Sequence, residues 1–100
     1  MGSDGSGVSP SAELTSLVTI CNPRGLHARA AARLVKLVDQ FDAEITVRKG
    51  DRSASGRSIM GLMMLAAGPG CEIELSASGP DCVAALAAVV DLISRRFDEG

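Results

Sequence analysis

The sequence lacks the aromatic side chains on which many nucleic-acid-binding surfaces depend. It has no tryptophan and no tyrosine, and Phe41 and Phe97 are its only phenylalanines. Its formal net charge of −2 also gives no general attraction to a phosphate backbone. Because bases stack on aromatic rings in single-strand binding sites, we expect no nucleic-acid partner. With 46% hydrophobic residues, the core is expected to be largely aliphatic.

The sequence is also poor in the residues that hold metal ions. Its three cysteines, Cys21, Cys71 and Cys82, form no CxxC pair, and it has a single histidine, so no zinc site is predicted. We expect reduced thiols with a structural role, which are typical of a cytosolic protein. We expect no metal and no cofactor.

Long hydrophobic segments are missing as well. No apolar run approaches the ~18 residues that a membrane-spanning helix needs, so we expect no membrane insertion and a cytoplasmic location. Residues 1–12 are rich in glycine and serine and contain no apolar signal core. We expect them to form a disordered tail ahead of one folded domain over residues 13–100.

Hydrophobic periodicity in the rest of the chain predicts both strands and helices. Residues 14–21, 43–48 and 71–77 read as strands, and residues 52–55 as a short polar edge strand. Helical spacing predicts helices over residues 28–40, over residues 59–67 and from Asp81 to about residue 97, with two arginines in the last turns. The order β-α-β-β-α-β-α predicts an α+β fold: a four-stranded antiparallel sheet with three helices on one face.

The only histidine, His27, lies where a turn meets the start of a helix, in the run Gly-Leu-His-Ala-Arg over residues 25–29. A helix start leaves backbone N–H groups unpaired and favours an anion. Arg29 can add a forked cation, and an imidazole is a nucleophile near neutral pH. The pattern predicts a histidine that carries, or attacks, a phosphoryl group. The alternative is a surface or helix-capping histidine with no chemistry.

Charge is distributed unevenly around this segment. Residues 21–60 hold eight Lys and Arg against four Asp and Glu, whereas residues 61–100 hold two against six. A local basic excess favours a phosphate or an acidic partner. The nearest helper to His27 in the sequence is Arg29 rather than a carboxylate, which argues against a hydrolase of the Ser-His-Asp or Cys-His kind.

A second segment, around Ser58, begins the short helix. Ser58 is a plausible N-cap residue, and a plain cap is the simplest interpretation of it. Met60, Met63 and Met64 at helical spacing would normally belong to a core. A helix of two turns cannot bury every face, so we expect some of these side chains to be exposed.

These segments resemble the HPr family, the histidine-containing phosphocarrier proteins of the bacterial phosphoenolpyruvate-dependent phosphotransferase system. Residues 25–29 and the alanine-rich helix behind them resemble the family signature. Residues 57–62 are similar to its regulatory serine segment, and the predicted elements agree with the family from about residue 14 to residue 97. The resemblance implies an open-faced β-sandwich. It also implies a stoichiometric phosphocarrier, rather than a stand-alone enzyme, in sugar uptake or in the regulatory nitrogen branch.

The resemblance also implies roles for individual residues. His27 would accept a phosphoryl group from phospho-enzyme I on Nδ1 and pass it to an enzyme IIA-type protein. Arg29 would stabilise that group, and Arg24 would add a second cation. Ser58 matches a serine that a dedicated serine kinase/phosphorylase modifies. The expected docking surface consists of an apolar patch and a basic rim, which include Ile59, Met60, Met63, Arg57 and Arg33.

Two positions depart from the family pattern. Ala30 stands where proline is frequent, and we expect the helix to survive because alanine is a good helix former; alanine here is also seen in branches linked to nitrogen regulation. Arg24 stands where many members carry asparagine. The transfer potential and the pathway therefore stay open. The alternative function is a small-metabolite-binding regulatory α+β domain without phosphotransfer, and we expect a monomer.

Overall fold

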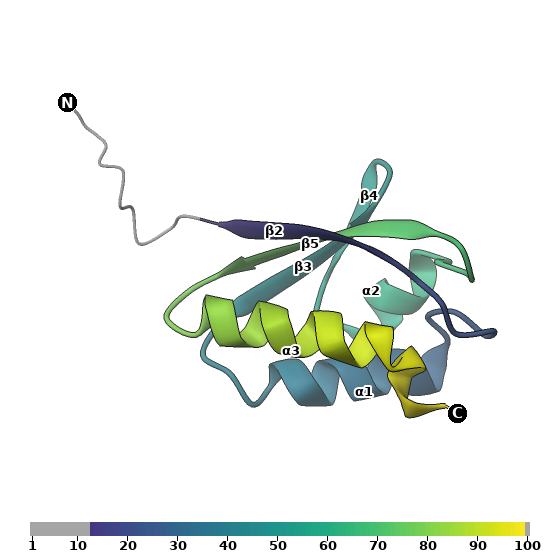
Figure 1. The fold of residues 1–100 in the computed structure, drawn as a ribbon. Coiled ribbons are helices and arrows are strands. Elements are labelled where there is room, and N and C mark those ends of the chain that lie inside the picture. The colour runs from purple at the N-terminus through teal and green to yellow at the C-terminus, as the bar shows by residue number, and fades with distance from the viewer. Residues whose placement is uncertain (1–12, 100) are drawn as a thin grey trace.

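The computed structural model describes residues 13–99, and the predicted tail over residues 1–12 lies outside this range. Its strands and α-helices follow one another in the predicted order (Figure 1). They are β2 (Leu14–Thr19), α1 (Ala28–Val38), β3 (Glu44–Lys49), β4 (Arg52–Ser55), α2 (Ile59–Met64), β5 (Glu72–Ser78) and α3 (Cys82–Ser94), and a 3-10 turn, η1 (Arg96–Asp98), follows α3.

The four strands form one antiparallel sheet in the order β2-β5-β3-β4. β5 pairs with β2 on one side and with β3 on the other, and β4 pairs with β3 at the edge. Helices α1 and α3 lie side by side beneath the sheet, and α2 contacts α1 and β4 (Figure 1). The predicted open-faced arrangement, with the helices on one face, is confirmed.

Side-chain alternation in the strands explains why one face of the sheet is covered. On β5, Ile73, Leu75 and Ala77 are buried, whereas the alternating polar residues Glu72, Glu74 and Ser76 face the open side. Ile45 and Val47 are buried in the same way on β3. In α1, Ala30 is fully buried beside the aliphatic stripe, so alanine in place of proline leaves the helix intact, as expected.

The structure corrects several sequence-based boundaries and faces. The short helix α2 ends at Met64 rather than at residue 67, because Ala66 takes a left-handed backbone conformation with φ of 54°. On α3 the buried stripe is formed by Ala85, Val89, Leu92 and Ile93, so the predicted Leu86 and Val90 are only half-buried at its border. Within residues 13–99 no helix has the length and hydrophobicity to cross a lipid bilayer.

The loop between α1 and β3 is fastened by polar groups from distant segments. The Arg57 guanidinium pairs with Asp39 Oδ1 at 2.6 Å and donates to the backbone oxygens of Ala43, at 2.8 Å, and Phe41, at 3.3 Å. Asp81 Oδ2 accepts from the backbone N–H of Asp42 at 2.8 Å and makes no capping bond to α3. Arg57 therefore fastens this loop while its side chain stays partly exposed.

We expect Arg57→Ala to lower the free energy of unfolding by about 1–2 kcal/mol, because two backbone carbonyls lose a charged donor. The matched control is Arg48→Ala, which removes an exposed pair with Glu74 on the open face and should cost under about 0.5 kcal/mol. Urea denaturation of both variants measures the difference. Equal losses would mean that the Arg57 contacts contribute no more than a surface ion pair.

Candidate functional site

His27 is the N-cap residue of α1. Its backbone is extended, its carbonyl accepts from the N–H of Ala31 at 2.8 Å, and Nδ1 of its ring accepts from the N–H of Arg29 at 3.3 Å. The predicted helix cap is confirmed. The first turn of a helix leaves N–H groups without helical partners, so Nδ1 lies at a position that favours an anion.

The two residues before His27 anchor the ring to the loop that follows α2. Gly25 has a φ of +65°, and a Cβ on it would come within 2.4 Å of the backbone oxygen of Ala67. Leu26 is buried and donates its N–H to that same oxygen at 2.8 Å. Only glycine tolerates both the positive φ and the close approach of the Ala67 oxygen at position 25. This packing brings the His27 and α2 segments to the same end of the molecule (Figure 1).

The second ring nitrogen of His27 meets a carboxylate that sequence reasoning missed. Nε2 contacts Oε2 of Glu99, 72 positions further along the chain, and both side chains are largely buried, with exposed fractions of 17% and 13%. The expectation that Arg29, and no carboxylate, is the nearest helper was wrong. Within residues 13–99 neither ring nitrogen contacts a hydroxyl or a thiol, so no hydrolytic triad is formed.

These two contacts determine the tautomer of the neutral ring. Nδ1 accepts a hydrogen bond from a backbone N–H, so it must present its lone pair. Nε2 must then carry the proton and donate it to Glu99. At 3.3 Å the bond to Nδ1 is long and weak, so the lone pair is released at little cost.

The surroundings of Glu99 favour its charged form. The hydrogen bond to His27 lowers the pKa of Glu99 most, followed by the bond that Asn22 donates to it. The charges of His27 and Arg24 lower the pKa further, and partial burial opposes these effects. A carboxylate therefore faces the imidazole, ready to pair with a positive ring.

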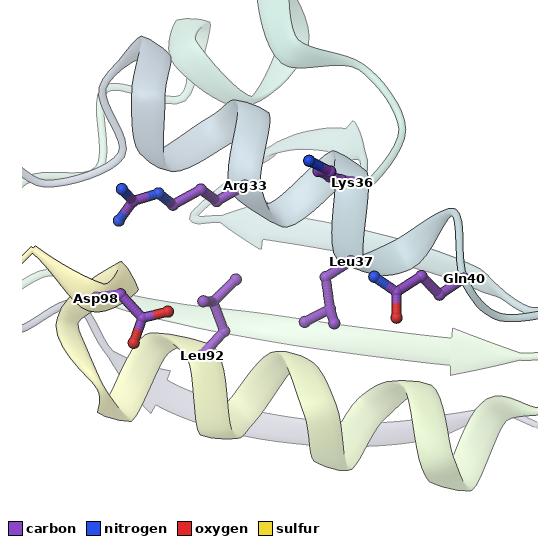
Figure 2. Close-up of a pocket in the computed structure, with 6 residues that line it drawn as sticks. All are labelled: Arg33, Lys36, Leu37, Gln40, Leu92 and Asp98. Atoms are coloured by element: carbon purple, nitrogen blue, oxygen red, sulfur yellow. The ribbon is translucent and has the colours of Figure 1, made fainter.

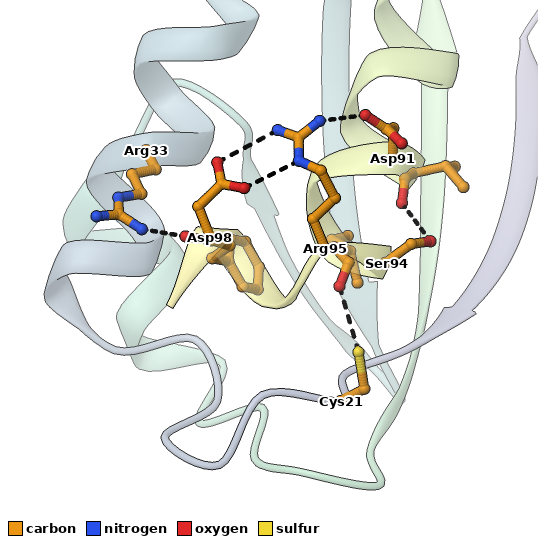
Figure 3. Close-up of polar contacts among 9 residues, drawn as sticks. Cys21, Arg33, Asp91, Ser94, Arg95 and Asp98 are labelled. Atoms are coloured by element: carbon orange, nitrogen blue, oxygen red, sulfur yellow. Dashed lines mark hydrogen bonds and ion pairs between the residues drawn. The ribbon is translucent and has the colours of Figure 1, made fainter. Parts of the chain in front are cut away.

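A strained turn brings Glu99 to the ring. Arg96, Phe97 and Asp98 have φ values of 58°, 54° and 60°, a left-handed conformation that costs roughly 1 kcal/mol or more for each non-glycine residue. Complete burial of Phe97 and a pair between Arg95 and Asp98 hold the turn in place (Figure 3). Arg95 is the C-cap of α3 and Arg96 lies beyond the helix, so the prediction that both lie in its last turns was wrong.

The predicted arginines have different surroundings. Arg24 and Arg29 are exposed near the ring, whereas Arg33 is half-buried and donates to the backbone oxygen of Phe97 (Figure 3). Figure 2 shows the Arg33 side chain reaching along a groove between α1 and α3 toward the C-terminal turn. Arg33 therefore binds the turn that carries Glu99. The groove is lined by Arg33, Lys36, Leu37, Gln40, Leu92 and Asp98.

The α2 segment has the predicted cap and the predicted exposure. Ser58 Oγ accepts from the N–H of Gly61 at 3.0 Å and caps the helix. Ile59, Met60 and Met63 are exposed, with fractions of 41%, 69% and 39%, and Met64 is exposed by 68%. We call these four residues the α2 patch. The cysteines are free thiols, and within residues 13–99 no three His, Cys, Asp or Glu side chains are grouped to hold a metal ion.

We expect the Glu99 contact to make stability depend on acid. Because the pKa of Glu99 is lowered from its ordinary value of 4.5, the contact stabilises the folded state above about pH 4.5. That contribution is lost as the pH falls through the lowered value. In urea denaturation, Glu99→Gln should be less stable than wild type at pH 6, and the difference should shrink toward pH 3. The exposed Glu44→Gln is the control, and a difference for Glu99→Gln that stays constant with pH would contradict this account.

Comparisons with known proteins identify relatives across most of the chain. Residues 14–95 match the family described as "PTS HPr component phosphorylation site". The chain is 49% identical over 87 residues to phosphocarrier protein NPr of Shewanella violacea, covering 87% of this chain and 96% of that protein. It is 46% identical over 87 residues to phosphocarrier protein HPr of Neisseria meningitidis serogroup A, with 87% and 98% covered. HPr-C-His from Thermoanaerobacter tengcongensis has a similar structure, with a TM-score of 0.83 at 39% identity over 87% of this chain and 98% of that one.

The matched region includes the segments of His27 and Ser58 on which the sequence resemblance depended, whereas Glu99 lies beyond it. The relatives are matched over nearly their whole length, so the agreement concerns the complete fold and not one motif. This chain belongs to the HPr family of the phosphotransferase system.

Proposed function

We propose that this protein carries a phosphoryl group on Nδ1 of His27 and passes it between enzymes of the phosphotransferase system. Membership of the HPr family supports the carrier role. One observation supports His27 as the residue that carries the group: its two ring nitrogens are differentiated, with a lone pair on Nδ1 at a helix start and a proton on Nε2 against Glu99. The protein is consumed and regenerated in each transfer, and is a stoichiometric carrier rather than a stand-alone enzyme.

The proposed transfer begins when the Nδ1 lone pair attacks the phosphorus atom of the donor. The Nδ1–P bond forms as the bond between phosphorus and the donor breaks, and the weak contact with the Arg29 N–H is given up. The ring gains a positive charge, with its proton still on Nε2, and the Glu99 carboxylate stabilises that charge. The same step in reverse delivers the group to an acceptor.

Exposed cations and backbone amides would bind the phosphoryl oxygens. The Arg29 N–H in the first turn of α1 is directed at Nδ1, N–H groups at a helix start favour an anion, and Arg29 can add its guanidinium fork. Arg24 supplies a second cation from the loop before the ring, where its charge already acts on Glu99. Neither arginine is buried, so both can reorient as the group arrives and leaves.

We further propose phospho-enzyme I as the donor and an enzyme IIA-type protein as the acceptor, which the family membership supports at the level of phosphotransferase enzymes in general. The α2 patch would dock both, with Arg24 and Arg29 as its basic rim. Arg33 and Arg57 would contribute less, since their guanidinium groups are bound within the chain. The similarity to NPr is nearly equal to that to HPr, so we assign the carrier role without choosing between sugar uptake and the nitrogen branch.

Residues 13–100 would form the carrier domain, acting as a monomer in the cytoplasm. A serine kinase/phosphorylase would modify Ser58, whose Oγ already accepts from a helix N–H. The added charge of about −2 would lie beside the α2 patch and repel acidic partners.

The alternative function, a small-metabolite-binding domain, would use the groove between α1 and α3 (Figure 2), and His27 is not among the residues that line this groove.

We expect His27→Ala to fold and to accept no phosphate. Wild type and variant are incubated with phosphoenolpyruvate and enzyme I, and the added phosphate is measured by mass and by its lability in acid and stability in base. Ser58→Ala is the matched control and should be phosphorylated like wild type. Acid-labile phosphate on His27→Ala would exclude His27 as the carrier, and an unmodified wild type would exclude the function.

We expect Met60→Glu to weaken binding to enzyme I at least roughly tenfold, because a charge would enter the apolar centre of the docking surface. Val83→Glu is a matched control: Val83 is 70% exposed, against 69% for Met60. It lies in the first turn of α3, which begins at the end of the molecule away from α2 (Figure 1). Titration calorimetry gives the affinities, and circular dichroism checks the fold. An equal loss in both variants would contradict docking at the α2 patch.

A further inference from the structure

Asn22 is the one polar residue that is fully buried within residues 13–99. Its side-chain Nδ2 donates to the backbone oxygen of Gly25 at 2.8 Å and to Oε1 of Glu99 at 3.0 Å. Both N–H groups of the amide are therefore used, whereas Oδ1 has no partner in the described part of the chain. A buried polar group is costly unless it is hydrogen-bonded, so this position requires a donor more than it requires an acceptor.

We propose that Asn22 is a positioning residue for phosphoryl transfer: by holding Oε1 of Glu99 it aims Oε2 at Nε2 of His27, and so keeps Nδ1 as the nucleophilic atom. This inference rests on the proposed carrier function and adds a residue to it. The hydrogen bonds of the Asn22 side chain reach neither the imidazole nor any reacting atom. It acts only through Glu99 and through the turn at Gly25.

The geometry requires an amide in this orientation. Turning the amide over would place Oδ1 against two acceptors, the Gly25 carbonyl and the Glu99 carboxylate, and both contacts would become repulsive. A carboxylate has two oxygens, and here one is held by Asn22 and the other faces His27. Because both oxygens are engaged, the plane of the carboxylate cannot rotate without breaking one of the two bonds.

The same amide couples two segments that would otherwise move separately. One of its N–H groups fastens the turn in which Gly25 has a positive φ, and the other fastens Glu99, which follows the turn after α3. That residue follows three consecutive left-handed residues, which would relax if nothing held their end. Asn22 thus ties the approach to the helix and the carboxylate together around one imidazole.

A purely structural role for Asn22 is the competing explanation. In that case its bond to Gly25 would matter and its bond to Glu99 would not. A second substitution distinguishes the two explanations. Exchanging donor and acceptor between positions 22 and 99 restores the bond between these two side chains, but it does not restore the bond to the Gly25 oxygen.

The test is a rescue experiment with Asn22→Asp, Glu99→Gln and the double variant. Asn22→Asp keeps the size of the side chain but sets one carboxylate against another. We expect it to slow phosphorylation of His27 by enzyme I at least roughly tenfold, because even a shift of about 1 Å in a reacting group can cost a factor of about a hundred. In the double variant the amide introduced at position 99 can donate to the carboxylate introduced at position 22. We expect its rate to return to within about threefold of that of Glu99→Gln alone.

A second readout requires no enzyme. His27 is the only histidine, so its ring nitrogens give the only imidazole signals in a long-range ¹H–¹⁵N spectrum. We expect wild type to show the tautomer with the proton on Nε2, Asn22→Asp to show a mixture, and the double variant to regain the wild-type form. An unphosphorylated wild type would contradict the proposed function while leaving this test of Asn22 intact.

Losses that simply add in the double variant, or an unchanged tautomer in a folded Asn22→Asp, would overturn the inference. If Asn22→Asp does not fold, the side-chain amide of Asn22 is followed in wild type and in Glu99→Gln. Its resonances should shift on that substitution, and no shift would equally overturn the proposal.

Discussion

The imidazole of His27 is held at both nitrogens, and the surrounding structure is arranged to make those two contacts different. A backbone N–H faces Nδ1, and a carboxylate faces Nε2. A ring that is free to exchange its proton would present the lone pair at either atom, whereas this ring presents it at one. In the proposed transfer, the weaker contact lies on the side that would open for chemistry, and the charged contact lies on the side that would persist.

The position of Glu99 depends on packing that lies well away from the ring. Phe97 is fully buried and anchors the C-terminal turn, Arg33 holds the backbone oxygen of Phe97, and Arg95 pairs with Asp98 (Figure 3). The backbone of this turn is strained, so these contacts must exceed the cost of three left-handed residues. Backbone strain that persists beside a candidate site indicates that the site needs the Glu99 side chain in this position.

Four arginines of the basic region over residues 21–60 are divided between two roles. Arg33 and Arg57 bind backbone carbonyls and hold the C-terminal turn and the loop before β3. Arg24 and Arg29 stay exposed beside His27. A carrier must bind its cargo without retaining it, and exposed cations suit that requirement better than buried ones, whose interactions with a phosphoryl group would be stronger and slower to break.

Local patterns in the sequence determined the elements, the sheet with helices on one face, the helix cap at His27 and the exposure of Met60, because periodicity and capping act over a few neighbouring residues. They did not determine where α2 stops, since the left-handed Ala66 has no local signature. On α3 they indicated the buried Val89 and Ile93 but not Ala85 and Leu92, since that helix is apolar almost all round. Tertiary structure alone decided that Glu99 reaches His27 and that Asn22 reaches Glu99, across 72 and 77 positions. Contacts between residues so far apart along the chain depend on how all the intervening elements pack, and no short stretch of sequence carries that information.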